Sequence, residues 1–432
     1  MRNKFIYIYY FVLILVLALY TNMSHSPNML IRLGYLAALV LPLVPRKELV
    51  PAVFICTLGI SANTFAYPFM PTDMYYYVIL ALLMAIQSLY RHDFHTRISP
   101  LFVVAVIYVG LNDIIMQGEL SQMVTVFFIC ILFYFCMGDV TEVDNHLSLS
   151  FVFISLAISY WALFCPDAQI NNYNKAEDMQ QTGWTDPNYL SIVLGAGLVV
   201  AIKDLIKGNN KALYTIILIM TVLGSIIAML QLASRGAILA AVLATVVLLV
   251  FSKSPIWIKI TSIILMALLV SYLYTNDYMD FVLARFETED GTGNKRTLIW
   301  RSKLEDFFRY GNLFDWIFGV GQSKGVELGE FYGKGLSTHN DFLSVLIYYG
   351  FTGIGILFSV IVYPLRICQK SERPQIIALL VFLLMCSMSI EPLARGNVVY
   401  WGFFFYIMVL ARQSQKMELI EEEEEEEDEE QD

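Results

Sequence analysis

A histidine and a polar turn open an apolar run at residues 337–355, "STHNDFLSVLIYYGFTGIG". Ser337 or Thr338 can cap the helix that this run predicts, and Asp341 complements its positive end. His339 then falls in or beside the first turn. There the helix dipole disfavours imidazolium, so the neutral histidine can accept a proton, as a general base must. The alternative is a histidine that only contributes to capping.

A single arginine interrupts a long apolar stretch in "LQLASRGAILAAVL". A charge inside a membrane segment is costly and tends to serve function, which makes Arg235 a second candidate. Gly236 beside it leaves room for another group to approach. The alternative is a minimal hairpin whose guanidinium extends to the lipid headgroups. We favour function, because so short a turn needs no charge.

The segment 276–340 is the one polar piece large enough to form part of a site. Within it, Trp300, Leu304 and Phe307 recur at helical spacing, with Arg301 among the polar positions. This pattern predicts an amphipathic helix lying on the surface of the outer leaflet of the membrane. The "FGVG" that follows is a weak phosphate-cradle signal, because the strand-loop-helix context is missing. The basic residues of the segment are Arg285, Lys295, Arg296, Arg301, Lys303, Arg309, Lys324 and Lys334.

A third polar group precedes another apolar run, in "TGWTDPNYLS". Asp186 and Pro187 fit a helix N-cap and the first helical position. Capping does not explain Asn188 or Trp184. An amide and an indole at a membrane surface suit sugar binding, although Trp184 is equally well explained as an interfacial anchor.

The elements that must position these residues are transmembrane helices. The chain is 57% hydrophobic and 15% charged, with a mean hydropathy of +0.61, far from the composition of soluble domains. We therefore predict an all-α polytopic membrane protein with about 12–14 transmembrane helices and one large external (periplasmic) loop, 276–340. We read the first run as a retained helix and not as a cleaved signal. The predicted spans lie near 5–22, 29–44, 48–67, 74–90, 98–116, 122–138, 147–165, 187–206, 212–232, 237–252, 256–275, 341–364, 374–390 and 397–411.

Lysine and arginine gather at every second short loop, which predicts two cytoplasmic termini and an external position for the candidate site. Arg32 is the main charge that we expect inside a span. Lys203, Lys207 and Lys211 belong to one of the basic cytoplasmic loops.

The acidity of the chain is confined to its end. The formal charge is −10, but twelve acidic residues and no basic ones follow from Glu418 onward. Such a run repels itself and predicts disorder. We divide the chain into N-terminal membrane helices, 1–183, a membrane region that includes the external loop, 184–411, and a disordered acidic cytoplasmic tail, 412–432.

Neither cysteine nor histidine forms a metal-binding pattern. The six cysteines are scattered without close pairs and are interpreted as small core residues. The histidines of "RHDFHTR", 91–97, have one carboxylate beside them and suit a solvated loop better than a metal site.

These residues together resemble the O-antigen ligase and O-antigen polymerase superfamily of bacterial envelope glycan transferases. The ligase motif is His, then Asn, Ser or Gln, nine residues, Gly, two residues, and Gly, Thr or Tyr. It is met in full by His339, Asn340, Gly350 and Gly353. "ASRGAIL" is similar to the external Arg-Gly of the family, "KRTLIW" to its loop arginine and tryptophan, and "DPNYLS" to its Asp-Pro-Asn stretch. The resemblance is strongest over about 184–364.

The resemblance implies transfer of a glycan from an undecaprenyl-diphosphate-linked donor to an acceptor hydroxyl, without metal or other cofactor, at the external face of the bacterial inner membrane. The implied catalytic residues are His339, Arg235 and Arg296. His339 would deprotonate the acceptor, and the arginines would neutralise the leaving diphosphate. The implied substrate-binding residues are Asn340, Asn188, Asp186, Trp300 and Arg301. The implied partners are the glycan donor, a lipid or glycan acceptor and membrane lipids, with no nucleic acid.

Three alternatives stay open. A repeat-unit polymerase for O-antigen, capsule or exopolysaccharide, or a protein O-glycosyltransferase, would use the same donor and differ in the acceptor. A flippase for lipid-linked oligosaccharides would have a similar number of helices but would place charges near the bilayer midplane. A purely structural scaffold would leave the complete motif from His339 to Gly353 unexplained.

Overall fold

All regular elements of the described chain are helices. The computed structural model describes residues 43–44, 46, 49–52, 75–92, 94, 99–118, 120–137, 143–164, 187–208, 211–232, 234–252, 255–275, 296–329, 337–389, 393 and 398–431. No strand occurs in these ranges, so the predicted all-α class is confirmed. The helices are α4 (Tyr75–Arg91), α5 (Pro100–Gln117), α6 (Gln122–Cys136), α7 (Val143–Phe164), α8 (Pro187–Lys207), α9 (Ala212–Gln231), α10 (Arg235–Phe251), α11 (Ile256–Thr275), α13 (Arg296–Tyr310), α14 (Leu313–Phe318), α15 (Gln322–Glu327), α16 (Asp341–Ile367), α17 (Arg373–Ser389) and α18 (Val398–Gln431).

Several of these helices have the length and composition of membrane spans. Within the described part of the chain, α5, α9, α16 and residues Asn188–Lys207 of α8 form four helices that are long and apolar enough to cross a bilayer. Shorter apolar helices accompany them, in α4, α6, α7, α10 and α17. This is a membrane protein. The predicted spans 5–22, 29–44 and 48–67 fall wholly or largely outside the described residues, so the total of 12–14 and the external position of 276–340 stay predictions.

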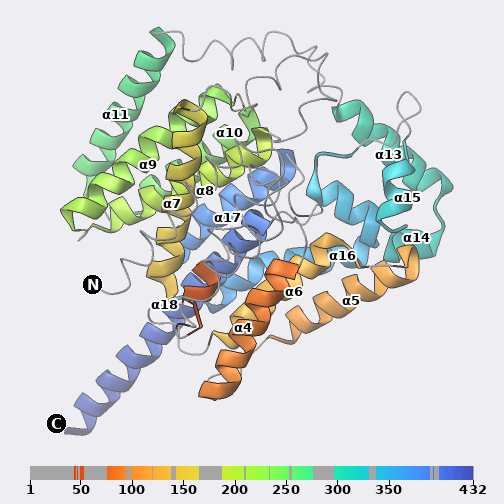
Figure 1. The fold of residues 1–432 in the computed structure, drawn as a ribbon, viewed down its shortest axis with the longest axis horizontal. Coiled ribbons are helices and arrows are strands. Elements are labelled where there is room, and N and C mark those ends of the chain that lie inside the picture. Colours follow the sequence, from red (N-terminus) through yellow and green to blue (C-terminus); the bar gives the residue numbers. More distant parts are fainter. Residues whose placement is uncertain are drawn as a thin grey trace, which may run out of the picture.

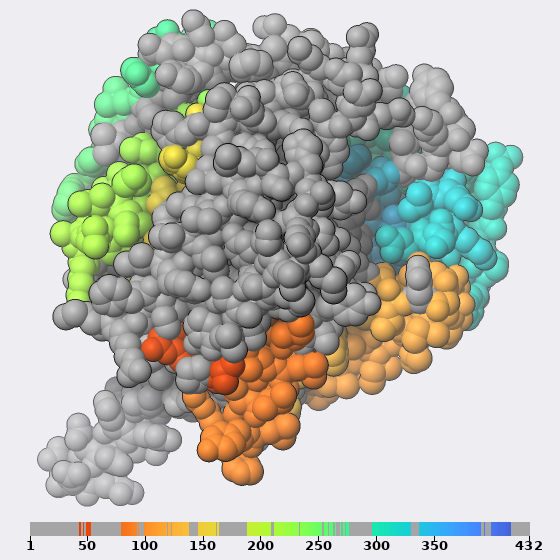
Figure 2. Space-filling view, in the orientation of Figure 1, coloured from red at the N-terminus to blue at the C-terminus, as the bar shows by residue number. Residues whose placement is uncertain are grey.

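The helices form two packed groups that share α16, α17 and α18. Figure 1 shows α7, α8, α9, α10 and α17 side by side, and α4, α5 and α6 near α16 and α18. The short helices α13, α14 and α15 lie against α16, and α15 also contacts α5. In the space-filling view the region 296–329 lies beside α5 at one side of the molecule (Figure 2).

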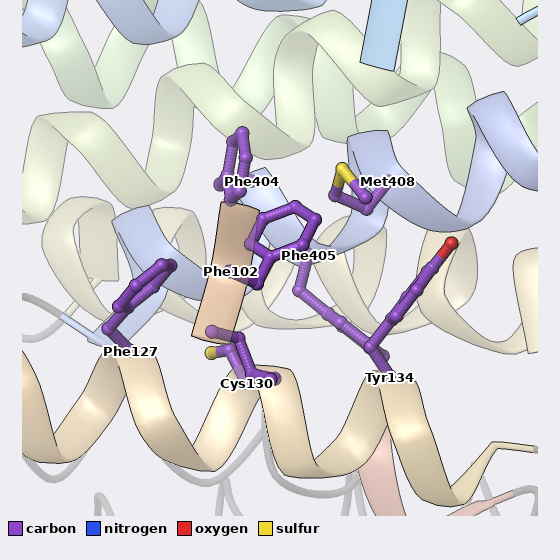
Figure 3. A pocket seen from close by; sticks show the side chains of 8 residues that line it. Phe102, Phe127, Cys130, Tyr134, Phe404, Phe405 and Met408 are labelled. Carbon is purple, nitrogen blue, oxygen red and sulfur yellow. The ribbon is translucent and has the colours of Figure 1, made fainter. Parts of the chain in front are cut away.

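Helix α18 packs into the centre of the bundle through its aromatic side chains. Tyr406 and Phe403 are buried, and the ring of Phe403 meets that of Phe151 edge-on at 5.3 Å between centroids. Between α5, α6 and α18 the packing leaves an apolar cavity of about 20 Å³ (Figure 3). A space of this size holds about one methyl group, so the aromatic layer is closely packed.

The acidic tail differs from its prediction. We expected disorder over 412–432, whereas α18 continues as one helix to Gln431 and extends away from the bundle in Figure 1. Glutamate is a good helix former, and extending a helix that is already nucleated adds one hydrogen bond per residue without a new nucleation cost. Our prediction weighed the repulsion between the carboxylates and neglected this continuity.

The two ends of the main helix group can be distinguished by contacts. The last turns of α8 and α10 and the first turn of α17 line one cavity, so these three ends meet. At the other end Ser234, just before α10, donates a hydrogen bond to Asn188 in the first turn of α8, 3.1 Å long. Helix α17 therefore runs antiparallel to α8 and α10. The starts of α8 and α10 and the last turn of α17 share one end of the bundle.

Candidate active site at the head of α16

His339 adopts a backbone conformation that is unusual for its residue type. Its φ is 51°, in the left-handed region, and it stands directly before the helix cap of α16. Histidine is one of the few residues besides glycine found there with some frequency, and the conformation still costs roughly 1–2 kcal/mol. The imidazole is half-buried. Strain of this kind persists only where the surrounding contacts determine the turn.

Asn340 is the cap of α16, and this corrects the predicted cap. Its side-chain oxygen accepts the backbone N–H of Leu343 at 3.1 Å, whereas Ser337 and Thr338 lie outside the helix. Serine, threonine and asparagine are almost equal as caps, so preference alone cannot choose among neighbours. Asn340 was also predicted to bind substrate. Among the described residues its amide nitrogen has no hydrogen-bond partner, so this half of the side chain is available for that role.

Thr338 fixes the turn from inside. Its side chain is fully buried, and the hydroxyl donates to the carbonyl of Asn340 at 2.9 Å and lies 2.6 Å from the hydroxyl of Ser344. The backbone N–H of Asn340 donates to the same hydroxyl at 3.1 Å. A buried hydroxyl with several partners is a rigid anchor, because losing any of them leaves a polar group unsatisfied.

Trp300 connects the turn to the amphipathic helix that the sequence predicted, which the structure forms as α13. The indole Nε1 donates to the carbonyl of Thr338 at 2.6 Å. The predicted role for Trp300 was contact with the lipid-linked donor. Its indole N–H holds the backbone one residue before His339, and contact with the donor stays a prediction.

Asp341 ties the other side of the turn to the chain that follows α17. Its carboxylate is fully buried and accepts the backbone N–H of Leu393 at 3.0 Å. The sequence suggested only a favourable charge at the helix start. The end of α17 and the head of α16 therefore meet, at the same end of the bundle as the starts of α8 and α10.

The guanidinium of Arg296 reaches this end. As the first residue of α13 it donates from Nη1 to the carbonyl of Ser389, the last residue of α17, at 2.7 Å. A carbonyl at a helix C-terminus carries partial negative charge, which suits a cation. Arg296 is thus held by α17, half-buried, beside the chain that Asp341 binds.

Arg235 and Asn188 lie at this same end, on α10 and α8. Arg235 is the first residue of α10, half-buried, and Ser234 before it donates to the side-chain oxygen of Asn188. Asn188 was predicted to contact sugar, and the structure shows that it fixes the chain at Arg235. The backbone here agrees with the predicted alternative of a short hairpin between α9 and α10. The group that the guanidinium of Arg235 binds stays a prediction.

One predicted binding residue, Arg301, is not brought to this turn. Arg301 is 79% exposed and pairs with Glu305, one helical turn further on α13, at 2.6 Å. The hydrogen bond to Glu305, together with its charge, raises the pKa of the Arg301 guanidinium. Asp186 and Trp184 lie outside the described residues, and so does Arg32.

The glycine half of the motif serves the backbone of α16. Gly350 has φ 66° and ψ −168°, which breaks the helix and deprives the preceding carbonyls of their usual partners. The N–H of Val320 donates to the carbonyl of Ile347 at 2.9 Å, and that of Gly321 to Tyr348 at 3.1 Å. The amides of Val320 and Gly321 are therefore occupied by α16, and that of Gly319 by the carbonyl of Asp315 in α14, which argues against the phosphate cradle. Close approach of chain to chain explains its glycines instead.

A buried carboxylate in α5 was missed by the sequence analysis. Asp113 is fully buried and accepts hydrogen bonds from the hydroxyl of Tyr349, 2.9 Å, and the N–H of Ser121, 2.8 Å. Tyr108 in the same helix donates to the carbonyl of Tyr349 at 2.7 Å. Asp113 is a further charge within a predicted span, and the expectation for Arg32 lies outside the described residues. The only available signal was an Asn-Asp pair inside an apolar run.

Lys303 is another buried charge with a structural explanation. Its ammonium donates to the carbonyls of Gly325, Val326 and Leu328, 2.7–2.9 Å away, at the C-terminal end of α15. The side chain is fully buried. Of the basic residues in 276–340, this one secures the loop and is not exposed to a substrate.

The described cysteines lie in the core. Cys130, Cys136, Cys368 and Cys386 are free and buried, as expected of small core residues. Across the described residues no group of His, Cys, Asp and Glu could hold a metal ion.

Comparison with known proteins agrees with the motif. Residues 219–358 match the family model described as O-Antigen ligase, a range that includes Arg235, Arg296, Trp300 and His339. No curated protein sequence matches the chain. At the level of the family, the match supports a membrane glycosyltransferase of the O-antigen ligase or polymerase type. Over residues 219–358 the chain is similar to the O-antigen ligase family.

Proposed function

We propose that this protein transfers a glycan from an undecaprenyl-diphosphate-linked donor to an acceptor hydroxyl, in the manner of an O-antigen ligase. The observation that carries the proposal is the left-handed His339 in a turn fixed on two sides, by Trp300 and by Asp341. A costly conformation held by buried contacts, at the head of a helix inside the family match, is expected of a residue that performs chemistry.

In the proposed reaction His339 takes the proton of the acceptor hydroxyl. The acceptor oxygen forms a bond to the anomeric carbon while the bond between that carbon and the diphosphate oxygen breaks. The leaving diphosphate keeps the bonding electrons, so its negative charge increases and needs neutralisation. Arg235 and Arg296 have permanently charged side chains suited to phosphate oxygens, and the first residue of α10 and the last residue of α17 lie at the same end of the bundle.

The remaining predicted contacts divide into binding and positioning. Asn340 would orient the sugar or the imidazole through its amide nitrogen. Trp300 and Asn188 would act through the backbone at His339 and at Arg235. Arg301 and Asp186 stay proposals for donor binding, at the membrane surface and at the start of α8. We place this end of the bundle on the periplasmic face of the inner membrane, with both termini in the cytoplasm.

A repeat-unit polymerase is the second candidate, because the family match does not separate acceptors. The pattern of Arg, ten residues and Gly found in some polymerase loops does not follow Arg285, Arg296, Arg301 or Arg309. This favours the ligase over that polymerase type. A flippase is the third candidate, and buried charges such as Asp113 do not by themselves favour it, because its carboxylate is occupied by Tyr349 and Ser121.

The test compares two histidines with the same backbone conformation. His92, after α4, has φ 50°, against 51° for His339, and is exposed. His92→Ala and His339→Ala therefore remove an imidazole at similar backbone strain. In cells whose only copy is the variant, we expect His339→Ala to match a deletion strain in glycan gels, with transfer reduced by about 10²- to 10⁴-fold. His92→Ala should match the intact protein.

The glycans that accumulate identify the acceptor class. Full-length chains that stay on the lipid donor indicate a ligase, whereas short lipid-linked repeats indicate a polymerase. Normal glycans with His339→Ala, at protein levels equal to those of His92→Ala, would contradict the proposal. Transport of the lipid-linked glycan that continues without His339 would then favour the flippase.

A further inference from the structure

A polar cavity lies at the end of the bundle opposite His339. It has a volume of about 340 Å³, at the lower end of the roughly 300–1,000 Å³ common for ligand pockets. The ends of α8 and α10 and the start of α17 form it. Its lining combines apolar side chains with charged and hydrogen-bonding ones: Lys203, Ile206, Lys207, Leu248, Phe251, Ser252, Pro255, Ser371, Glu372, Pro374 and Gln375.

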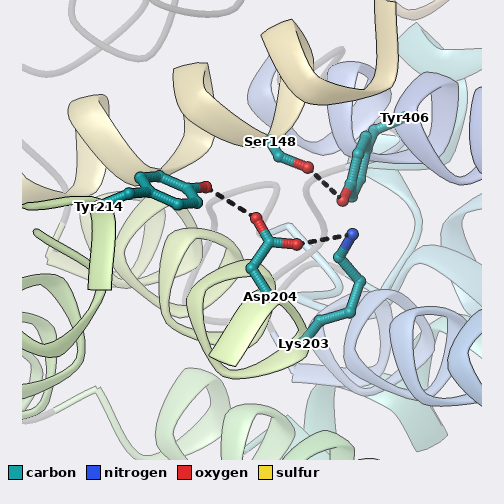
Figure 4. Close-up of polar contacts among 5 residues, drawn as sticks. All are labelled: Ser148, Lys203, Asp204, Tyr214 and Tyr406. Atoms are coloured by element: carbon teal, nitrogen blue, oxygen red, sulfur yellow. Dashed lines mark hydrogen bonds and ion pairs between the residues drawn. The ribbon is translucent and has the colours of Figure 1, made fainter. Parts of the chain in front are cut away.

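One wall of the cavity is a buried polar network (Figure 4). Lys203 is only 4% exposed and pairs with Asp204 at 2.9 Å. Asp204 also accepts the hydroxyl of Tyr214 at 2.8 Å, and the ammonium of Lys203 lies 5.4 Å from the ring of Tyr406. We had assigned Lys203 to a basic loop, and the structure buries it in α8 instead. The network holds α8, α9 and α18 together, so this wall is rigid.

Among the described residues that line the cavity, the other charged groups are one cation and one anion. Lys207 is exposed at the end of α8, and Glu372 is half-buried before α17. Since Lys203 already pairs with Asp204, the charges of the lining and its pair sum to zero. A simple anion would be attracted by Lys207 and repelled by Glu372. A ligand that carries both signs of charge matches this lining better.

The surroundings place the cavity at a membrane boundary. Phe251, which lines it, is 60% exposed, and Ile256 and Trp257 just beyond it are 69% and 65% exposed. Aromatic side chains at helix ends are typical of the level of the lipid headgroups. The sequence places this lysine-rich end of the bundle in the cytoplasm.

We propose that the cavity binds the headgroup of a zwitterionic phospholipid with a phosphate and a primary amine, as in phosphatidylethanolamine. Lys207 receives the phosphate. Glu372 and the side-chain oxygen of Gln375 receive the ammonium. The acyl chains follow the exposed apolar side of α10 and α11 from Phe251. This site is separate from the transfer reaction and does not depend on it.

The experiment uses the purified full-length protein in nanodiscs of phosphatidylcholine. Fluorescent phosphatidylethanolamine or phosphatidylglycerol is added at low fraction, and binding is measured by energy transfer from the tryptophans and by native mass spectrometry. The variants are Lys207→Gln and Glu372→Gln. Lys211→Gln is the matched control, because Lys211 is an exposed lysine near the same end that does not line the cavity.

The two variants should act in opposite ways on the anionic lipid. Lys207→Gln should weaken binding of both labelled lipids about five-fold. Glu372→Gln should weaken phosphatidylethanolamine and strengthen phosphatidylglycerol by a similar factor. Lys211→Gln should change neither. Because none of these residues belongs to the proposed transfer site, glycan transfer by the variants should continue, which separates a failure here from a failure of the proposed function.

Three outcomes would overturn the lipid assignment. Equal binding of both lipids in all variants means that no headgroup site exists here. Tighter binding of phosphatidylglycerol by the intact protein means that the site takes an anionic lipid. Displacement of the labelled lipid by millimolar inorganic phosphate, with the same dependence on Lys207, means that a free phosphate is the ligand.

Discussion

The two halves of the motif from His339 to Gly353 have different tasks. The first half sets a polar turn, with His339 strained and Asn340 capping α16. The second half breaks the helix at Gly350 and lets two loop amides bind the exposed carbonyls. The first half places the candidate catalytic histidine, and the second half shapes the backbone of α16 that supports it. The motif is one continuous pattern in the sequence, but its two halves form two separate structural features with nine residues between them.

The largest effect is expected from a substitution at Gly350, where α16 is broken, and it tests whether the two halves of the motif have separate tasks. In Gly350→Ala the new methyl group would lie 2.4 Å from the carbonyl oxygen of Ile317, at a φ that alanine avoids. We expect a loss of about 3 kcal/mol or more in folding stability, because backbone atoms cannot yield. The measurement is the yield and thermal unfolding of the detergent-solubilised protein.

The matched control for that variant lies in the same helix. A methyl group at Gly355 meets nothing within 4 Å, so Gly355→Ala should leave stability unchanged or slightly improved. If Gly350→Ala is as stable as Gly355→Ala but inactive, the glycine half takes part in chemistry and the division is wrong.

A smaller effect is expected from the carboxylate that supports the break. Asp113→Asn keeps the shape but replaces an acceptor of two hydrogen bonds by an amide that cannot accept both in the same way. We expect a loss of about 1–3 kcal/mol, since a buried partner is left unsatisfied. Unfolding should be compared with that of Tyr349→Phe and of the double variant.

The double variant separates direct from indirect effects. If Asp113 acts through Tyr349, the two changes together should cost less than the sum of the single ones. Simple additivity would show that the hydrogen bond at 2.9 Å contributes little and that Asp113 serves another group.

The smallest predicted effect on stability is at the turn that contains His339, the first half of the motif. Trp300→Phe removes the hydrogen bond to the carbonyl of Thr338 and keeps most of the ring packing, so we expect a loss of about 1 kcal/mol. Turnover should fall more than donor binding does, because the backbone before His339 is less fixed. Donor binding and transfer should be measured on the same sample.

Another indole in the same region provides the comparison. Trp316 donates to the carbonyl of Phe307 through a longer contact, 3.3 Å, away from the turn. Trp316→Phe should leave the ratio of turnover to binding unchanged. Equal effects in both variants would show that the loop responds to any lost indole N–H and that Trp300 has no special influence on His339.

Much of the fold was predictable because the length of an apolar run largely determines a membrane helix. The runs near 212–232 and 341–364 correspond to Ala212–Gln231 and Asp341–Ile367, within a few residues. The candidate His339 was found because polar residues at the ends of apolar runs stand out in sequence, and Arg296 was found through the resemblance of "KRTLIW" to the loop of the family. Their roles and that of Arg235 stay predictions.

What the sequence could not show are contacts between residues far apart in the chain. Asp113 looked like an isolated acid, and its partner Tyr349 lies 236 residues away. Lys203 looked like one of three loop lysines, and only the packing of α8 against α9 and α18 buries it. For Trp300 the residue was predicted but its use was not, because the turn that it binds forms only in the folded chain.

The break at Gly350 also has a mechanical consequence. Residues 341–349 are clamped at both ends, through Asp341 to Leu393 and through Tyr349 to Asp113, whereas 351–367 continue toward the opposite end of the bundle. A membrane of different thickness tilts a spanning helix. We expect α16 to accommodate such a tilt at Gly350, between the held segment 341–349 and the segment 351–367. The geometry around His339 should then depend little on the thickness of the surrounding bilayer.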